Sequence, residues 1–128
     1  MIILDASVLI AYLDRDDAGH RRAQKLLARE IDEELAANPL TLAEVLVVPA
    51  RDGRLAQVQA ALADLEIQEL AFPSHTAVKL ALLRAGTGLN MPDCCVLLAA
   101  EAVGSRLASF DASLLRAAAT RGLATVEL

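Results

Sequence analysis

The sequence MIILDASVLI, residues 1–10, determines how the rest of the chain is interpreted. Residues 1–4 are apolar and predict a short buried strand that ends at Asp5, and residues 7–13 have helical character. A carboxylate among so many apolar neighbours is costly to bury unless it is paired or binds a metal. The first basic side chain of the sequence is Arg15, so Asp5 has no local cationic partner. Asp5 is therefore the first candidate for a functional residue.

Outward from this stretch, short apolar segments alternate with helical ones. Further strands are expected at residues 34–37, 67–72, 106–110 and 124–128, and further helices at residues 20–30, 41–51, 54–65, 73–85, 92–103 and 111–121. The alternation predicts an α/β fold in three layers, with a short, mainly parallel five-stranded sheet between helices. Ligands of such sheets bind beyond the carboxyl ends of the strands. Asp5 and Asp111 each follow a strand, so we expect both at that edge.

Length and composition limit the classes of protein that the chain can belong to. Its 128 residues predict a single domain, residues 1–128. No apolar run approaches the roughly 20 residues of a membrane span, and no signal peptide is recognisable, so a cytoplasmic protein without membrane contact is expected. The net charge of −5 and the aromatic content of 2% argue against a module that binds RNA through a broad basic surface or stacked rings. They argue less against a nuclease, whose metal site must itself be acidic.

Three further acids stand at positions where chemistry and helix capping both explain them. Asp111, like Asp5, could cap the helix that follows it. The segment Thr41–Glu44 fits a capping box, in which the glutamate returns to the first backbone N–H of its helix. Asp93 lies in a first helical turn, where the helix dipole favours a negative charge. Taken singly, each acid therefore leaves both interpretations open.

Taken together, the four acids favour a metal site. Two carboxylates about 4 Å apart repel each other by on the order of 4 kcal/mol at an effective dielectric constant of 20, so a cluster of them needs a cation. Oxygen ligands without a histidine or cysteine suit Mg²⁺ or Mn²⁺. Such ions lower the pKa of bound water and hold phosphate oxygens during hydrolysis. The acids therefore predict hydrolysis of a phosphodiester.

The same residues resemble the motifs of the PIN domain family, and specifically of the short VapC-type toxins of bacterial toxin–antitoxin pairs. Residues 3–10, ILDASVLI, resemble the first strand of that family with its aspartate and a hydroxyl residue two positions later. The segment Thr41–Glu44 resembles the second acidic motif, and the helix of Asp93 resembles the third. Ser109–Asp111, read as SFD, resembles the fourth.

This resemblance implies a metal-dependent endoribonuclease that uses Mg²⁺ or Mn²⁺, acts as a toxin, forms a homodimer and is neutralised by a cognate antitoxin protein. It assigns catalysis and metal binding, directly or through water, to four acids: Asp5, Glu44, Asp93 and Asp111. Ser7 and Ser109 would orient these ligands through hydrogen bonds, with ordinary turn or helix capping as the alternative. Many relatives carry a further acidic or amide residue shortly after the fourth acid, whereas residues 112–115 read ASLL, so the number of metal ions stays open.

Arg51 is the best candidate for a substrate contact, because it lies seven positions after Glu44 and hence two helical turns along the same face. A receiver-like signalling domain that binds Mg²⁺ is an alternative. It would require an adjacent acidic pair after the first strand and a lysine after the last core strand, whereas Lys25 and Lys79, the two lysines of the sequence, lie within expected helices. A catalytically inactive PIN-fold interaction module is a second alternative, and it leaves the four acids unexplained.

Overall fold

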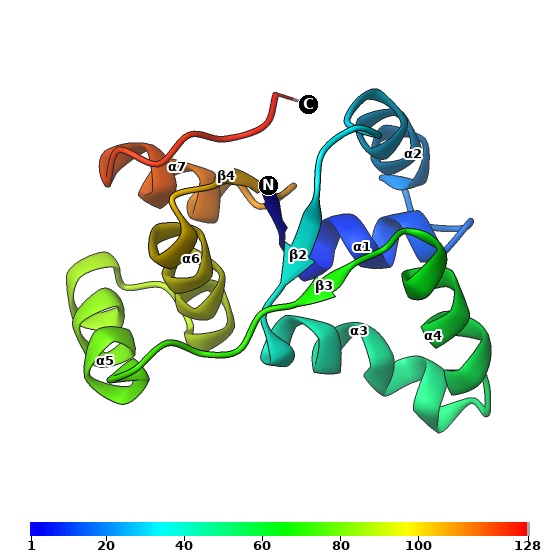
Figure 1. Ribbon diagram of the computed structural model, residues 1–128, viewed down its shortest axis with the longest axis horizontal. Coiled ribbons are helices and arrows are strands. Elements are labelled where there is room, and N and C mark those ends of the chain that lie inside the picture. Colours follow the sequence, from blue (N-terminus) through cyan, green and yellow to red (C-terminus); the bar gives the residue numbers. More distant parts are fainter. Residues whose placement is uncertain (128) are drawn as a thin grey trace.

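The computed structural model describes residues 1–127 and shows an α/β domain (Figure 1). Its strands are β1 (Ile2–Leu4), β2 (Leu35–Ala37), β3 (Gln68–Glu69) and β4 (Arg106–Ala108). Its helices are α1 (Ala6–Leu13), α2 (His20–Arg29), α3 (Pro39–Arg51), α4 (Leu55–Asp64), α5 (Thr76–Thr87), α6 (Met91–Val103) and α7 (Ala112–Thr120). Up to α7, the strand and helix order is the alternation that the sequence predicts.

The sheet has the order β3-β2-β1-β4, and all its strand pairs are parallel. The central strand β1 is fully buried, as a strand of a parallel sheet covered on both faces should be. Its successive side chains point to opposite faces: Ile2 and Leu4 belong to one apolar cluster and Ile3 to the other. The first strand therefore joins both halves of the core.

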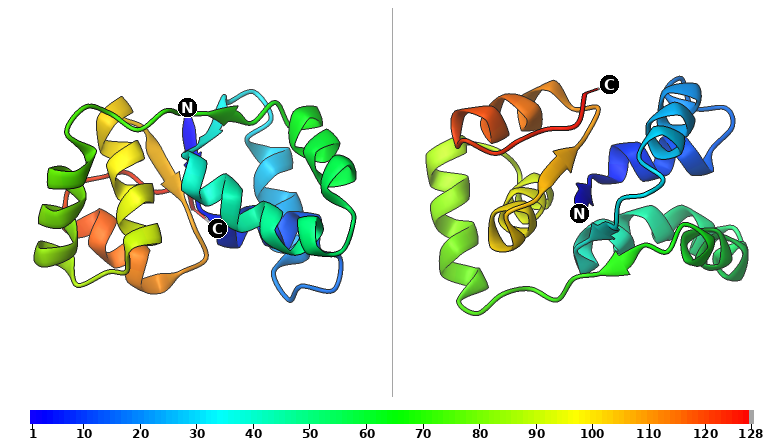
Figure 2. Two further views of the ribbon diagram at one scale, coloured as in Figure 1. Left: turned by 90° about the horizontal axis from the view of Figure 1, so that it is seen from below. Right: turned by 45° about the horizontal axis from the view of Figure 1, so that its top comes forward.

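The helices form two groups, one on each face of the sheet. Helices α1 to α4 contribute to the cluster around Ile2 and Leu4, and helices α5 to α7 contribute to the cluster around Ile3. The two groups lie on opposite sides of the strands in Figures 1 and 2. The edge formed by the carboxyl ends of the strands is thus bordered by both groups.

The expected five-stranded sheet is wrong, because the described residues form four strands. The segment expected at 124–128 meets β4 through a single bridge between Leu107 and Thr125, and the Val126 N–H donates to the Leu107 carbonyl at 2.8 Å. One bridge is not a ladder, so this segment extends the sheet at a single residue. Leu128, the last residue of the expected strand, lies outside the described residues.

Candidate active site

Asp5 lies between β1 and α1, and both of its carboxylate oxygens accept hydrogen bonds. It is 7% exposed, and its Oδ1 accepts the Ala6 N–H at 2.9 Å as the N-cap of α1. Its Oδ2 accepts two hydroxyl groups, from Ser7 at 2.8 Å and from Ser109 at 2.7 Å. Capping therefore explains one oxygen of Asp5, and the other oxygen joins the start of the chain to its last strand.

The two serines link Asp5 to the connection between β4 and α7. The Ser7 hydroxyl accepts the Phe110 N–H at 3.1 Å, and the buried Ser109 hydroxyl accepts the Asp111 N–H at 2.9 Å. Each hydroxyl thus accepts one backbone proton and donates its own proton to Asp5. Both serines bind this carboxylate, and Ser109 also closes a turn, because its hydroxyl accepts the N–H of the residue two positions later.

Replacing Ser109 with alanine is expected to lower the free energy of unfolding by about 1–3 kcal/mol, because it removes a donor from Asp5 and leaves the Asp111 N–H without its acceptor. Urea denaturation of the metal-free protein measures this difference. Ser105→Ala is the matched control, since its hydroxyl makes only a long contact of 3.5 Å with the Val103 carbonyl. Equal losses in both variants would contradict the importance of the serine link.

The capping-box interpretation of Glu44 is wrong, because α3 begins two residues earlier than expected. Asn38 is the N-cap, with its Oδ1 accepting the Thr41 N–H at 2.9 Å and its amide donating to the Thr41 hydroxyl at 3.0 Å. Pro39 occupies the first helical turn, where its missing N–H costs nothing. Glu44 is not needed at this helix end, and its side chain is exposed.

Asp93 lies in the first turn of α6, which Asn90 caps by accepting the Asp93 N–H at 2.9 Å. Burial raises the pKa of the Asp93 carboxyl to about 6, with three negative charges adding to the effect. These charges belong, in decreasing order of influence, to Asp5, Asp111 and Glu44. The pKa of Glu44 is also raised, first by partial desolvation of its carboxyl group, although the residue as a whole is exposed, and then by the charge of Asp5. Asp93 therefore lies near enough to the other three acids to be influenced by their charge.

No cation of the chain offsets this repulsion in the part that the structure describes. The ion pairs among residues 1–127 involve other acids: Glu30, Glu33, Asp52 and Glu101. Four carboxylates without an arginine or lysine partner provide hard oxygen donors and a negative potential. This donor set fits Mg²⁺ or Mn²⁺.

The structure does not bring the predicted ligands into a complete coordination shell. Within residues 1–127, no three His, Cys, Asp or Glu side chains are close enough together to hold one ion. Asp111 is exposed and caps α7, with its Oδ1 accepting the N–H groups of Ser113 at 2.8 Å and Leu114 at 3.2 Å. The capping interpretation of Asp111 is thus confirmed, and its second role in metal binding stays a prediction.

Two arginines, Arg51 and Arg22, lie on α3 and α2. Arg51 is exposed at the last residue of α3, about 10 Å along the helix axis from Glu44, and its substrate contact stays a prediction. No pattern in the sequence predicts a role for Arg22, whose guanidinium lies 4.5 Å from the centre of the Phe110 ring. This contact packs α2 against the residue between Ser109 and Asp111.

The raised pKa of Asp93 predicts a pH dependence of the metal-free protein. A carboxyl whose pKa is raised by folding stabilises the fold below its unfolded pKa of about 3.9, and this stabilisation is lost as the pH rises through about 6. The melting temperature of the wild type in EDTA should therefore fall, relative to that of Asp93→Asn, between about pH 4 and pH 7. A difference that does not change with pH would show that Asp93 titrates normally.

The fold and this edge define a parallel α/β domain with an acidic site beyond the carboxyl ends of its strands. The model of the PIN domain matches residues 2–120, and the chain belongs to the PIN domain family.

Several solved structures have a similar fold at low sequence identity. A toxin–antitoxin complex from Klebsiella pneumoniae has a chain with 21% identity and a TM-score of 0.74, over 87% of each chain. The sarcin–ricin loop cleaving toxin VapC20 of Mycobacterium tuberculosis has 15% identity and a TM-score of 0.75, over 100% of both chains. FitAcB from Neisseria gonorrhoeae has 20% identity and a TM-score of 0.75, over 99% of this chain and 97% of that one. No curated protein sequence matches the chain.

Proposed function

We propose that this PIN domain protein is a Mg²⁺- or Mn²⁺-dependent endoribonuclease that acts as the toxin of a toxin–antitoxin pair. The observation that carries the proposal is the raised pKa of Asp93, to which three neighbouring acids contribute while no cation of the described chain is paired with any of them. Membership of the PIN domain family and the similarity of the fold to those of toxins support it.

The acids would hold the metal, and the serines would set their geometry. The proposed ligands, directly or through water, are Asp5, Glu44, Asp93 and Asp111. A divalent ion held there would lower the pKa of water and offset the charge of phosphate oxygens. Ser7 and Ser109 keep the Asp5 carboxylate from rotating, because each holds Oδ2 by a short hydrogen bond. Asp5 is therefore preorganised before any ligand arrives.

The test is cleavage of RNA by the purified protein with Mg²⁺, with Mn²⁺ and with EDTA. Total cellular RNA is the first substrate, and an RNA carrying the sarcin–ricin loop is the second, because one structural relative is described as cleaving that loop. We expect internal cleavage that requires the divalent ion. Intact RNA under all metal conditions would support the inactive interaction module, and equal cleavage in EDTA would exclude the metal mechanism.

The proposed partner is an antitoxin that carries a cation into the acidic site. A chain of net charge −5 with unpaired site acids is complementary to an arginine, whose planar fork can hold a carboxylate by two hydrogen bonds. Removing that one arginine from the antitoxin should restore RNA cleavage more than it weakens binding, which calorimetry and a cleavage assay can measure together. An antitoxin that binds far from Asp5, Glu44 and Asp93 and leaves cleavage intact would contradict this mechanism.

The proposed assembly of the protein is a homodimer. The exposed Val78 and Leu82 lie one turn apart on α5 and offer an apolar surface for the proposed homodimer. Light scattering of the purified protein would measure its oligomeric state.

No helix among residues 1–127 is long and apolar enough to cross a membrane. A cytoplasmic location stays a prediction.

A further inference from the structure

A groove of about 600 Å³ lies beside the candidate active site, between α7 and the loop that joins α5 to α6. Both of its walls continue into elements that carry site acids. The loop wall includes Leu89 and leads into Asn90, the cap of the helix that holds Asp93. The helix wall includes Ser113, whose N–H donates to the Asp111 carboxylate. A strand bound across the acids could therefore continue along this groove.

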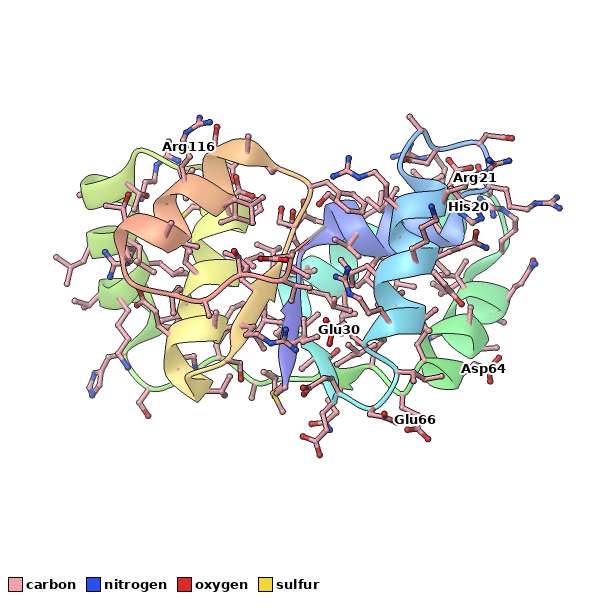
Figure 3. All side chains as sticks on the ribbon, turned by 90° about the horizontal axis from the view of Figure 1, so that it is seen from above. His20, Arg21, Glu30, Asp64, Glu66 and Arg116 are labelled. Carbon is pink, nitrogen blue, oxygen red and sulfur yellow. The ribbon has the colours of Figure 1, made fainter. Side chains whose placement is uncertain are left out.

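Basic side chains line this groove, whereas acidic side chains line a slightly larger pocket elsewhere on the surface. Among the described residues no carboxylate lines the groove, whereas two arginines do, Arg116 and Arg121. The larger pocket, of about 630 Å³, is lined by five acids and by no described lysine or arginine; its acids are Asp32, Glu33, Glu34, Asp64 and Glu66. Figure 3 shows Arg116 at the upper left of the molecule and Asp64 and Glu66 at the lower right. An anionic ligand would favour the groove beside the active site.

Arg116 is the arginine of this groove whose charge is available. Arg121 is paired with Glu101, while Arg116 is absent from the ion pairs of residues 1–127. The guanidinium of Arg116 donates to the Ser113 hydroxyl at 3.2 Å, so the side chain extends back toward the start of α7. A guanidinium has five N–H donors, and this contact uses one of them. Several donors therefore remain for a ligand.

The position of Arg116 fits a phosphate next to the cleaved one. Its backbone lies five residues, or about 7.5 Å of helix axis, beyond Asp111, and its head group is turned partly back over that distance. The guanidinium is thus displaced from the acids and extends the site in one direction. RNA carries a phosphate at every nucleotide, so a strand with one phosphate at the acids has its next phosphates alongside.

We infer that Arg116 binds a backbone phosphate of the RNA strand adjacent to the bond that is cut, and that the groove between α7 and the α5–α6 loop is the path of that flanking strand. The inference rests on the proposed ribonuclease function and adds a substrate-binding residue to it. Arg116 supplies affinity and register, since phosphate contacts fix the position of a strand without recognising its bases.

The test compares three variants by fluorescence anisotropy with a labelled, mixed-sequence single-stranded RNA in EDTA, over a series of salt concentrations. Arg116→Gln removes the charge, Arg116→Lys keeps it, and Arg29→Gln is the matched control. Arg29 is also an exposed helical arginine, and it pairs with Glu30 outside this groove. All four proteins are also assayed for cleavage in Mn²⁺.

We expect Arg116→Gln to weaken RNA binding about threefold to fivefold and to reduce the slope of log affinity against log salt by about 0.7, the value for one phosphate of a single strand. KM should rise by the same factor with kcat nearly unchanged. Arg116→Lys should keep the wild-type salt slope, and Arg29→Gln should match the wild type.

The outcomes separate this inference from the function on which it rests. If the wild type cleaves RNA while Arg116→Gln and Arg29→Gln have the same affinity and salt slope, the groove is not the strand path and the ribonuclease proposal stands. If the wild type neither binds nor cleaves any RNA, both proposals fail. A loss of kcat at unchanged KM in Arg116→Gln would also overturn the binding role.

Discussion

Replacing Asp93 with asparagine is expected to lower RNA cleavage at least about a hundredfold while the protein stays folded, because a metal ligand is lost without loss of shape. The side chain of Asp93 accepts no hydrogen bond from residues 1–127, so the amide breaks no internal contact there. Removing the charge also avoids the cost of its partial burial and its repulsion by the neighbouring acids, which together raise the pKa of this carboxyl to about 6. The variant should therefore be at least as stable as the wild type without metal.

Cleavage rate and melting temperature must be measured on the same preparation. Asp64→Asn is the control, because Asp64 is an exposed acid at the end of α4 and its loss changes the net charge equally. It should cleave RNA normally. If Asp93→Asn also cleaves at nearly the wild-type rate, Asp93 does not belong to the active site.

Asp5→Asn is expected to lose as much activity, but this substitution also disturbs hydrogen bonds within the folded protein. Asp5 uses one oxygen for the Ala6 N–H and the other for Ser7 and Ser109. Asparagine has a single carbonyl oxygen and cannot accept at both places. A lower melting temperature than that of Asp93→Asn should accompany the loss of cleavage.

Saturating Mn²⁺ is expected to raise the melting temperature of the wild type by roughly 10 °C. An ion at about a hundred times its dissociation constant stabilises the folded state by about 2.7 kcal/mol, and a domain of this size gains roughly 4 °C per kcal/mol. Here the ion would also offset the burial and the neighbouring negative charges that together raise the pKa values of Asp93 and Glu44. Differential scanning fluorimetry with increasing Mn²⁺ measures the shift.

Glu44→Gln provides the comparison, because Glu44 is exposed and is not part of its helix cap. Its metal-induced shift should be smaller than that of the wild type, although its metal-free stability should be equal or higher. A wild-type melting temperature that does not respond to Mn²⁺ or Mg²⁺ would leave the four acids as helix-end residues.

The first strand and the acid beside it were predictable because one stretch of sequence carried both signals. An apolar run followed by an isolated acid predicts a buried strand end whose charge needs a partner, and the structure places Asp5 there at 7% exposure. The carboxyl ends of parallel strands share an edge, which explains why the charge of Asp111, more than a hundred residues away, reaches the same region.

Helix starts and marginal strands were less predictable, because short-range signals compete. Asn38 followed by Pro39 is itself a strong helix start, and it overrides the capping box that Thr41 and Glu44 suggested. The residues from 124 onward are apolar enough for a strand but pair at Thr125 alone. How many bridges form depends on tertiary position, which a local pattern does not contain.

The hydroxyl bridge between the two ends of the chain has a consequence for protein synthesis. Asp5 is made 104 residues before Ser109. While the ribosome is still adding the last quarter of the chain, Asp5 lacks one of its two hydroxyl donors, and β1 has no β4 neighbour. Contacts between such distant residues form late and slowly during folding. A nascent or truncated chain that lacks Ser109 therefore cannot assemble this site, and the complete hydrogen-bond arrangement around Asp5 forms only after β4 and Ser109 have been made and have joined the sheet.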